Sequence, residues 1–392
     1  MGASRVMNVA GSREFFYEIV FGNHLFVTGN DTLSKYLTNK KCLVIMSDTI
    51  SRLYYKNINN YFTTETSTGN FRIVKIKTGE TNKEWVNVSL VIENAKKFDL
   101  GRRDLLIAIG GGILMDIVGF AASMYRRGID YIRIPTTLVG QIDAGIGLKT
   151  GVNFSNSKNF IGSFYPPIAA INDIEFLRTL PVHEIQNGLA ETIKMGIVTS
   201  KELFELLEEN IRELLTRNFR AEVFNDIYYL AIDAMIHELS ANFYEKVLER
   251  LVDFGHTFSP FIETHSNWSI SHGFAVAMDM AISTELAYLL GYLSPDKYCR
   301  ILNILLSSGL HIYDPRVYKP DLIHNSLKDI ILHRGGALNL VVPDDIGSGK
   351  FIKNIDLITT ERLNEAFCNL KNYQIRFQKN NSRYVNENCY SV

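Results

Sequence analysis

Cysteine is scarce in this sequence, and long apolar runs are absent. The four cysteines, Cys42, Cys299, Cys368 and Cys389, are scattered and form no CxxC pair. Their spacing indicates neither a disulfide framework nor a structural zinc site, and a reducing cytoplasm is the expected compartment. No stretch approaches the roughly 20 apolar residues of a membrane-spanning helix, and residues 1–15 lack the apolar segment of a signal peptide. We therefore expect no membrane partner.

An excess of charge of either sign is also missing. The 392 residues include 41 Lys and Arg against 42 Asp and Glu, a formal net charge of −1. Such a chain has no general attraction to nucleic acid or to an anionic membrane, so an anionic ligand must be held by a local cluster of cations. Hydrophobic residues make up 46% and charged residues 21%, which indicates a globular rather than a disordered chain.

The first half of the chain alternates predicted strands and helices. Short apolar runs predict buried strands at 42–46, 71–77, 105–109 and 131–135, and helical periodicity covers 82–98 and 113–125. Residues 15–20 and 24–28 are predicted to form a hairpin around Gly22 and Asn23. Strand–helix alternation of this kind predicts a Rossmann-like α/β fold, with a parallel sheet covered on both faces.

The second half has a different pattern. Helices are predicted at 182–198, 201–217, 221–245, 271–290 and 295–307, and between 174 and about 313 no strand is predicted. Residues 338–342 are compatible with one short strand. We place an α/β domain at 1–175, an all-α domain at 176–370 and a polar, Asn-rich tail, expected to be mobile, at 371–392.

Glycines mark two possible binding loops. Gly110, Gly111 and Gly112 follow a predicted strand and open a helix, in the pattern GGGxxxD that ends at Asp116. Glycine permits close approach of the backbone to a ligand, and the N-terminus of a helix attracts phosphate. A tight strand-to-helix turn explains the pattern equally well. Asp48 follows the strand at 42–46, where it is either a ribose ligand or the N-cap of a helix.

The second glycine-rich segment runs from about residue 135 to 159. It carries Asp143, Lys149, Lys158 and Asn159 among four further glycines. Backbone amides and two lysines close together suit a phosphorylated substrate. The alternative is an exposed loop with ordinary surface lysines.

Candidate metal ligands lie in the second half. Glu191, His256 and His272 supply one carboxylate and two imidazoles, the donor set of a catalytic zinc site with an open position. They are far apart in the sequence, so their spacing proves nothing, and a lone histidine is more often a packed or surface residue. His265 competes as a ligand. Lys194 lies one helical turn after Glu191.

The motifs GGGxxxD, RRG, PTTL, DAGIGLKTGVN, KNFIGSF, GLAETIK, DFGHTFSP and HG follow one another in this order. Together they resemble the sugar phosphate cyclases, a family that includes dehydroquinate synthase. The resemblance runs from about Asp48 to His272 and continues more weakly to about Gly347. It implies a dehydroquinate synthase-like fold, with an N-terminal NAD-binding α/β domain and a C-terminal helical metal-binding domain, usually in a homodimer.

The resemblance also implies roles for individual residues. NAD contacts would be Asp48, Glu80, Lys83, Gly111, Gly112, Asp116, Thr136, Thr137, Lys158, Thr179, Leu180 and Glu184. Zinc, or cobalt in its place, would be bound by Glu191, His256 and His272. Contacts to the substrate would come from Asp143, Lys149, Asn159 and Lys194. Arg127 resembles an arginine that reaches a phosphate across the dimer interface.

The sequence differs from dehydroquinate synthase at four positions, most of which carry a basic side chain in that enzyme. Where that enzyme has Asn, a second His, Lys and Arg, this chain has Asp253, Pro260, Met235 and Glu249, although Arg250 is adjacent. A substrate carboxylate left without these partners costs ~1–3 kcal/mol or more. The differences therefore favour a substrate without a carboxylate.

Residues 238–245 and the string VDFGHTFSP resemble the 2-epi-5-epi-valiolone synthases. These enzymes cyclise sedoheptulose 7-phosphate, with transient oxidation by NAD, phosphate elimination and an intramolecular aldol reaction. The resemblance adds Glu245 and Asp253 to the predicted catalytic residues, with His333 in place of a lysine. Alternatives are a 2-epi-valiolone synthase, a demethyl-4-deoxygadusol synthase, dehydroquinate synthase, a metal-dependent alcohol or glycerol dehydrogenase, and a non-enzymatic binding protein.

Overall fold

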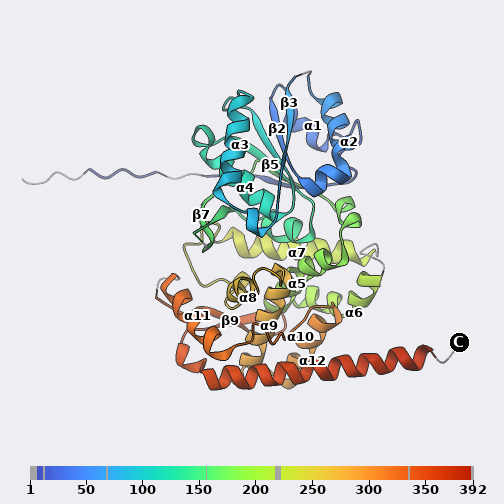
Figure 1. Ribbon diagram of the computed structural model, residues 1–392, viewed down its shortest axis with the longest axis vertical. Helices are drawn as coiled ribbons and strands as arrows, with labels where there is room; N and C mark the ends of the chain where they lie inside the picture. The colour runs from blue at the N-terminus through green and yellow to red at the C-terminus, as the bar shows by residue number, and fades with distance from the viewer. Residues whose placement is uncertain are drawn as a thin grey trace, which may run out of the picture.

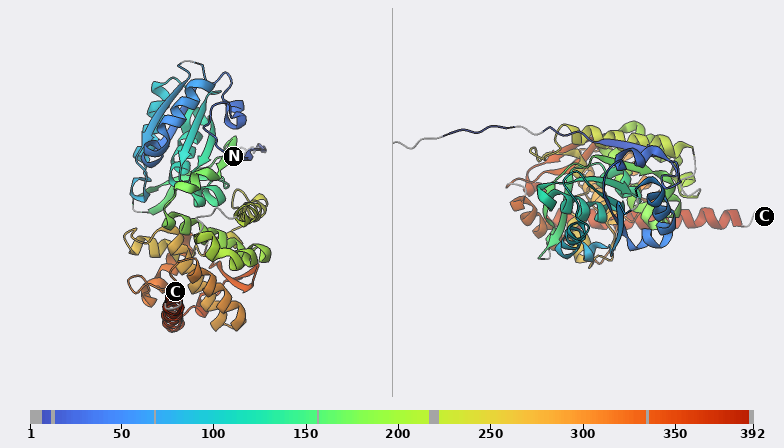
Figure 2. Two further views of the ribbon diagram at one scale, coloured as in Figure 1. Left: turned by 90° about the vertical axis from the view of Figure 1, so that its right-hand side faces the viewer. Right: turned by 90° about the horizontal axis from the view of Figure 1, so that it is seen from above.

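The structure is a computed structural model that describes residues 7–11, 14–67, 69–155, 157–216, 222–333 and 336–389. Figure 1 shows a sheet with its helices in the upper part of the molecule and a helical assembly below it. The side view in Figure 2 shows the same two layers stacked along the long axis. Among the described helices, none combines the length and the apolar character needed to span a membrane.

The predicted parallel sheet is confirmed, and it has six strands in the order β1-β8-β5-β4-β2-β3. Its strands are β1 (Glu18–Gly22), β2 (Cys42–Ser47), β3 (Phe71–Ile76), β4 (Leu105–Gly110), β5 (Asp130–Pro135) and β8 (Ala169–Asp173). The chain leaves β2 toward β3 and returns on the other side of β2 as β4. The direction of strand order thus reverses between β2 and β4, and in open α/β sheets ligands bind at such a point.

Four helices cover the sheet: α1 (Asp31–Leu37), α2 (Asp48–Glu65), α3 (Trp85–Lys97) and α4 (Gly112–Met124). Successive strand residues face opposite sides. Leu43 and Ile45 therefore pack with α3 and α4, whereas Val44 and Met46 pack with α1 and α2. Burial on both faces explains why β2 and β4 are apolar throughout.

The predicted N-terminal hairpin is wrong. β1 pairs in parallel with β8, with Glu18 beside Ala169, and residues 24–28 form turns instead of a second strand. The backbone N–H of Leu25 donates to Oδ2 of Asp173 at 2.8 Å, which ties these turns to the end of β8. A strand that ends in a turn has the same local pattern as a hairpin, and the partner strand lies far away in the sequence.

An antiparallel hairpin that the sequence did not predict lies outside the main sheet. It consists of β6 (Lys149–Phe154) and β7 (Ser157–Phe164), which pair with Lys149 beside Phe164. β6 packs on α4, where a Cβ at Gly119 would meet Thr150 Cγ2 at 2.5 Å. The hairpin carries three of the predicted site residues.

The second half of the chain is helical, as predicted. Its helices are α5 (Val182–Val198), α6 (Lys201–Thr216), α7 (Val223–Ser240), α8 (Ser259–His265), α9 (His272–Leu289), α10 (Pro295–Ser307), α11 (Pro320–His333) and α12 (Thr360–Cys389). Among the described residues, strands reappear only after α11, where β9 (Leu340–Asp345) pairs with β10 (Ser348–Ile352). The helix predicted at 221–245 is shorter, because the chain turns after Ser240 and Glu245 has a positive φ of 51°.

Residues 371–389, expected to be part of a polar, mobile tail, are helical in the structure. Helix α12 runs without a break to Cys389, and Figure 1 shows it passing beyond the other helices. Leu363, Phe367 and Leu370 are buried, and Tyr373 and Phe377 pack against the same core. These residues recur at helical spacing. Because the segment is rich in Asn and Lys, its apolar face was not recognised from the sequence.

Candidate functional site

The three predicted metal ligands meet at one point. Glu191 is fully buried in α5, His256 follows the 3₁₀ turn Leu251–Asp253, and His272 opens α9. Oε1 of Glu191 lies 3.2 Å from Nε2 of His272 and 3.6 Å from Nε2 of His256. Within the described part of the chain, these are the residues grouped closely enough to hold an ion, with ligand atoms inside 4.8 Å of one another. The competing His265 stacks on Phe261 instead.

Contacts between α5 and α9 explain why Glu191 and His272 lie together. The side-chain oxygen of Asn187, one turn before Glu191, accepts hydrogen bonds from the Ser271 hydroxyl at 2.7 Å and from the Gly273 N–H at 3.0 Å. A Cβ at Gly273 would lie 2.4 Å from the Asn187 backbone. The close helix crossing therefore requires glycine at this position and places His272 against Glu191.

Hydrogen bonds set the orientation of both imidazoles. Nδ1 of His256 lies 3.0 Å from the Phe254 carbonyl, and Nδ1 of His272 lies 3.1 Å from Oε1 of Glu263. If each Nδ1–H donates to its oxygen, the neutral ring presents the lone pair of Nε2 to an ion bound beside Glu191. Lys194 Nζ lies 2.5 Å from Oε2 of Glu191, on the other oxygen from the one that faces the histidines. One carboxylate and two neutral imidazoles fit zinc or cobalt with an open position.

Burial and neighbouring charges shift the pKa values of all three residues. Burial opposes ionisation of Glu191, but Lys194 and the two histidines outweigh it and hold its pKa well below the usual value. Burial also opposes protonation of His272, but Glu263 and Glu191 outweigh it and raise its pKa to about 9. Burial and the charge of Lys194 lower the pKa of His256 to about 4. A divalent cation would displace a proton from His272 on binding.

Asp143 and Lys194 extend this centre. Asp143 lies in a short π-helical turn, Gly140–Ala144, a feature that often marks a functional site. Burial and the charge of Glu191 raise the pKa of Asp143. Burial opposes protonation of Lys194, but Glu191 and Asp143 outweigh it and raise its pKa. The Lys194 ammonium is thus held between two carboxylates.

Predicted NAD contacts gather at the carboxyl edge of the sheet: Asp48 after β2, Gly111 and Gly112 after β4, Thr136 and Thr137 after β5, and Thr179 and Leu180 beyond β8. Ser47, not Asp48, caps α2, which leaves the exposed Asp48 carboxylate available. A Cβ at Gly111 would lie 3.2 Å from Thr137, and one at Gly112 would lie 3.1 Å from Ala144. Both glycines are thus closely packed, and the N-terminus of α4 that they form suits a pyrophosphate.

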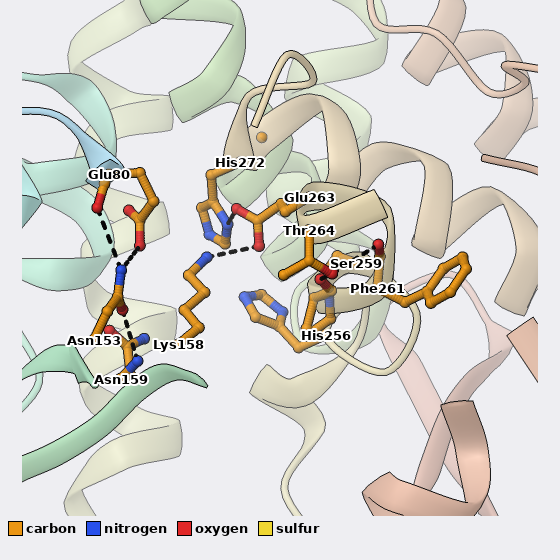
Figure 3. A network of polar contacts seen from close by, with 12 residues as sticks. Glu80, Asn153, Lys158, Asn159, His256, Ser259, Phe261, Glu263, Thr264 and His272 are labelled. Atoms are coloured by element: carbon orange, nitrogen blue, oxygen red, sulfur yellow. Dashed lines mark hydrogen bonds and ion pairs between the residues drawn. The ribbon is translucent and has the colours of Figure 1, made fainter. Parts of the chain in front are cut away.

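A second polar group joins the sheet to the β6–β7 hairpin. Nζ of the buried Lys83 lies 2.5 Å from Oδ2 of Asp116 and 2.6 Å from Oδ1 of Asn159. Asn153 donates to Oε1 of Glu80 at 2.9 Å and accepts from the Asn159 N–H at 2.8 Å. Figure 3 shows the Asn153 contacts beside the two histidines. Four predicted site residues are therefore neighbours.

Lys158 faces away from that group. Its Nζ lies 2.6 Å from Oε2 of Glu263 in α8, as Figure 3 shows. Glu263 was not predicted from the sequence. A signal existed, because Glu263 is an acidic residue in an otherwise uncharged helical stretch that follows His256, and buried acids are rarely without a partner.

Lys149 and Arg250 form a charge network with two predicted catalytic acids, Glu245 and Asp253. Nζ of Lys149 lies 2.5 Å from Oε1 of Glu245. Arg250 bridges Glu245 and Asp253 through its two terminal nitrogens. Two cations and two carboxylates thus neutralise one another.

Three predicted residues lie elsewhere. Arg127 is exposed beyond the end of α4, about 20 Å along the helix from Gly112. Glu184 contacts its neighbours His183 and Asn187. His333 ends α11, and its side chain lies outside the described residues.

Two family models match adjoining stretches of the chain. The N-terminal model of 3-dehydroquinate synthase matches residues 73–187, and its C-terminal model matches 188–329. The chain belongs to the 3-dehydroquinate synthase family. The family predicted from the motifs is therefore confirmed, and the chain is an enzyme of this family.

Individual relatives narrow the comparison. A 2-epi-5-epi-valiolone synthase of Streptomyces glaucescens is 40% identical over 350 residues, which are 89% of this chain and 90% of that one. A demethyl-4-deoxygadusol synthase of Trichormus variabilis is 34% identical over 93% of this chain and 90% of its own. The solved structure of the 2-epi-5-epi-valiolone synthase ValA from Streptomyces hygroscopicus subsp. jinggangensis, with NAD+ and Zn2+ bound, has a TM-score of 0.88 and 35% identity, covering 93% of this chain and 99% of that one. The predicted fold and the predicted likeness to the valiolone synthases are confirmed.

Proposed function

We propose that this enzyme is a 2-epi-5-epi-valiolone synthase, which converts sedoheptulose 7-phosphate to a C7 cyclitol and inorganic phosphate without net oxidation. The observation that carries the proposal is the charge pairing of two cations, Arg250 and Lys149, with predicted catalytic acids. Arg250 is held by Glu245 and Asp253, and Lys149 by Glu245. Met235, where dehydroquinate synthases have lysine, is 1% exposed within the hydrophobic core.

NAD and a divalent metal ion would supply the redox and Lewis-acid chemistry of the reaction. NAD bound at the carboxyl edge of the sheet would accept a hydride and return it, and a zinc or cobalt ion on Glu191, His256 and His272 would lower the pKa of a substrate hydroxyl. The geometry described above supports both assignments, because two neighbouring residues of β7 reach both groups: Asn159 contacts Lys83, and Lys158 contacts Glu263.

The chain's own residues bind and orient the substrate. Lys194, Lys149 and Arg127 are proposed to neutralise the phosphate, Arg127 from the partner protomer of a homodimer. Asp143 and Asn159 are proposed to hold substrate hydroxyls. Fixing a flexible heptulose in one orientation reduces the entropic part of the barrier to ring closure. We further propose that the protein acts in the cytoplasm.

A dehydrogenase acting on a neutral alcohol is the candidate of a different class. Such a substrate has no phosphate, so Lys149 and Lys194 would have no anionic group of the substrate to bind. A demethyl-4-deoxygadusol synthase remains the nearer alternative, since its relative is also 34% identical over most of the chain.

One incubation tests the proposal. Purified enzyme with NAD+ and Zn2+ is given either sedoheptulose 7-phosphate or a carboxylated heptulosonate phosphate, and phosphate release and product NMR are recorded. We expect phosphate and 2-epi-5-epi-valiolone from the first substrate only, with no build-up of NADH. Turnover of the carboxylated substrate, a different cyclitol, or stoichiometric NADH would each contradict the proposal.

A further inference from the structure

Glu263 divides its two oxygens between the two halves of the molecule. Oε1 lies 3.1 Å from Nδ1 of His272, and Oε2 lies 2.6 Å from Nζ of Lys158. The carboxylate is 3% exposed, so water competes little for either contact. Figure 3 shows the Glu263 carboxylate, from α8, in contact with both Lys158 of β7 and His272, the first residue of α9.

These contacts fix the ring of His272. With Nδ1–H donating to Glu263, Nε2 points at Glu191 Oε1, 3.2 Å away. His256 is oriented differently, by the carbonyl of Phe254 two residues earlier in its own turn. One proposed ligand is therefore held locally, and the other depends on a side chain that is itself held from the β6–β7 hairpin.

Lys158 restrains Glu263 from the hairpin side. Its Nζ also lies 5.9 Å from the ring centroid of Trp268, in the loop that connects α8 to α9. Salt bridging and cation–π attraction together hold the lysine over this loop. Rotation of the Glu263 carboxylate would break a charged contact at one end or the other.

We propose that Glu263 is a positioning residue for His272 at the metal, and that Lys158 fixes Glu263, so that the metal centre is completed by a side chain from the N-terminal half. The inference rests on the proposed function, in which Glu191, His256 and His272 hold the ion. A carboxylate that accepts the second N–H of a histidine ligand orients the ring and increases its basicity, and its loss typically lowers metal affinity 10- to 100-fold.

The test measures metal binding directly. Zn2+ affinity is determined by competition with a chelator, and the visible absorption of the Co2+-loaded protein reports ligand geometry. We expect Glu263→Gln to weaken Zn2+ binding about 10- to 100-fold and to shift the Co2+ bands. Lys158→Met should weaken binding about 3- to 10-fold, and Lys158→Arg, which keeps the charge, should restore it. The effects of Glu263→Gln and Lys158→Met should not add, because the residues act in series.

A matched control is the surface pair of Lys297 and Asp345, also 2.6 Å apart. Lys297→Met and Asp345→Asn should leave metal affinity and the Co2+ spectrum unchanged. Far-UV circular dichroism establishes folding, and Lys158→Met, at a partly exposed position, gives the answer if Glu263→Gln does not fold.

Three outcomes overturn the inference. Wild-type affinity and an unaltered Co2+ spectrum in both variants would overturn it while leaving the proposed function intact. Weaker NAD+ binding by Lys158→Met with unchanged metal affinity would make Lys158 a cofactor contact only. Failure of the wild-type protein to bind Zn2+ or Co2+ would overturn the metal site and the inference together.

Discussion

Lys194 Nζ lies 2.5 Å from Oε2 of Glu191, one turn earlier in α5, and both side chains are buried. The cation therefore neutralises the carboxylate on the side opposite the two histidines. This pair accounts for a fully buried carboxylate at the junction of the two halves, and it gives the first two predictions.

Glu191→Gln is expected to remove both metal binding and turnover, with activity at least about 1000-fold lower, because the neutral amide is a poor ligand. Zinc content after dialysis and phosphate release measure the two effects. Glu209→Gln, at an exposed position in α6, is the control. Full activity in metal-free Glu191→Gln protein would contradict the metal assignment.

Lys194→Met should destabilise the metal-free protein by about 3–5 kcal/mol, because Glu191 and Asp143 lose their shared cation inside the protein. A bound divalent ion neutralises Glu191, so saturating Zn2+ should recover part of the loss. Denaturant unfolding with a chelator and with Zn2+ measures both values. Equal destabilisation under the two conditions would mean that the ion does not sit at Glu191.

Gly273→Ala is expected to cost about 1–3 kcal/mol and to weaken metal binding, because the new Cβ would lie 2.4 Å from the Asn187 backbone and push α9 away from α5. Gly147→Ala is the control, since the nearest atom to its Cβ is 3.9 Å away. Thermal unfolding and chelator competition give the two readouts. A variant as stable as the control would show that the crossing tolerates a side chain.

Glu245→Gln should increase affinity for a carboxylated heptulosonate phosphate about 10-fold, because it releases Lys149 and Arg250 to pair with the ligand. Titration calorimetry measures binding without requiring turnover. Glu93→Gln, whose partner is the surface residue Lys97, is the matched control. Unchanged affinity in Glu245→Gln would mean that charge pairing does not exclude the carboxylate.

Asp279 should make stability depend on pH. Burial raises its pKa to about 6, although it accepts hydrogen bonds from the Phe258 and Ser259 N–H groups and the Ser283 hydroxyl. A carboxyl whose pKa is higher in the folded state contributes stability that is fully present below about pH 4 and is lost as pH rises through 6. The loss amounts to about 3 kcal/mol by pH 7.

Asp279→Asn keeps the shape and cannot ionise, so its stability relative to wild type should rise by about 3 kcal/mol between pH 4 and 7. Denaturant midpoints at several pH values measure the difference. Parallel profiles for the two proteins would rule out Asp279 as the titrating group.

The local pattern of apolar and polar residues determined the position of many strands and helices. The apolar runs of β2 and β4 and the periodicity of α5 and α10 predicted these elements within about a residue, because strands buried on both faces and amphipathic helices have distinct periods. The motif order indicated the family and named Glu191, His256 and His272.

Tertiary contacts decided the rest. The α5–α9 crossing, set by Asn187 and Gly273, brings His272 against Glu191, two proposed ligands whose spacing in the sequence carries no distance information. Glu263 and its partner Lys158 belong to elements far apart in the sequence. The same is true of β1 and β8, which pair in the main sheet. Long-range pairing depends on which surfaces remain to be buried after local structure has formed, and no short segment contains that information.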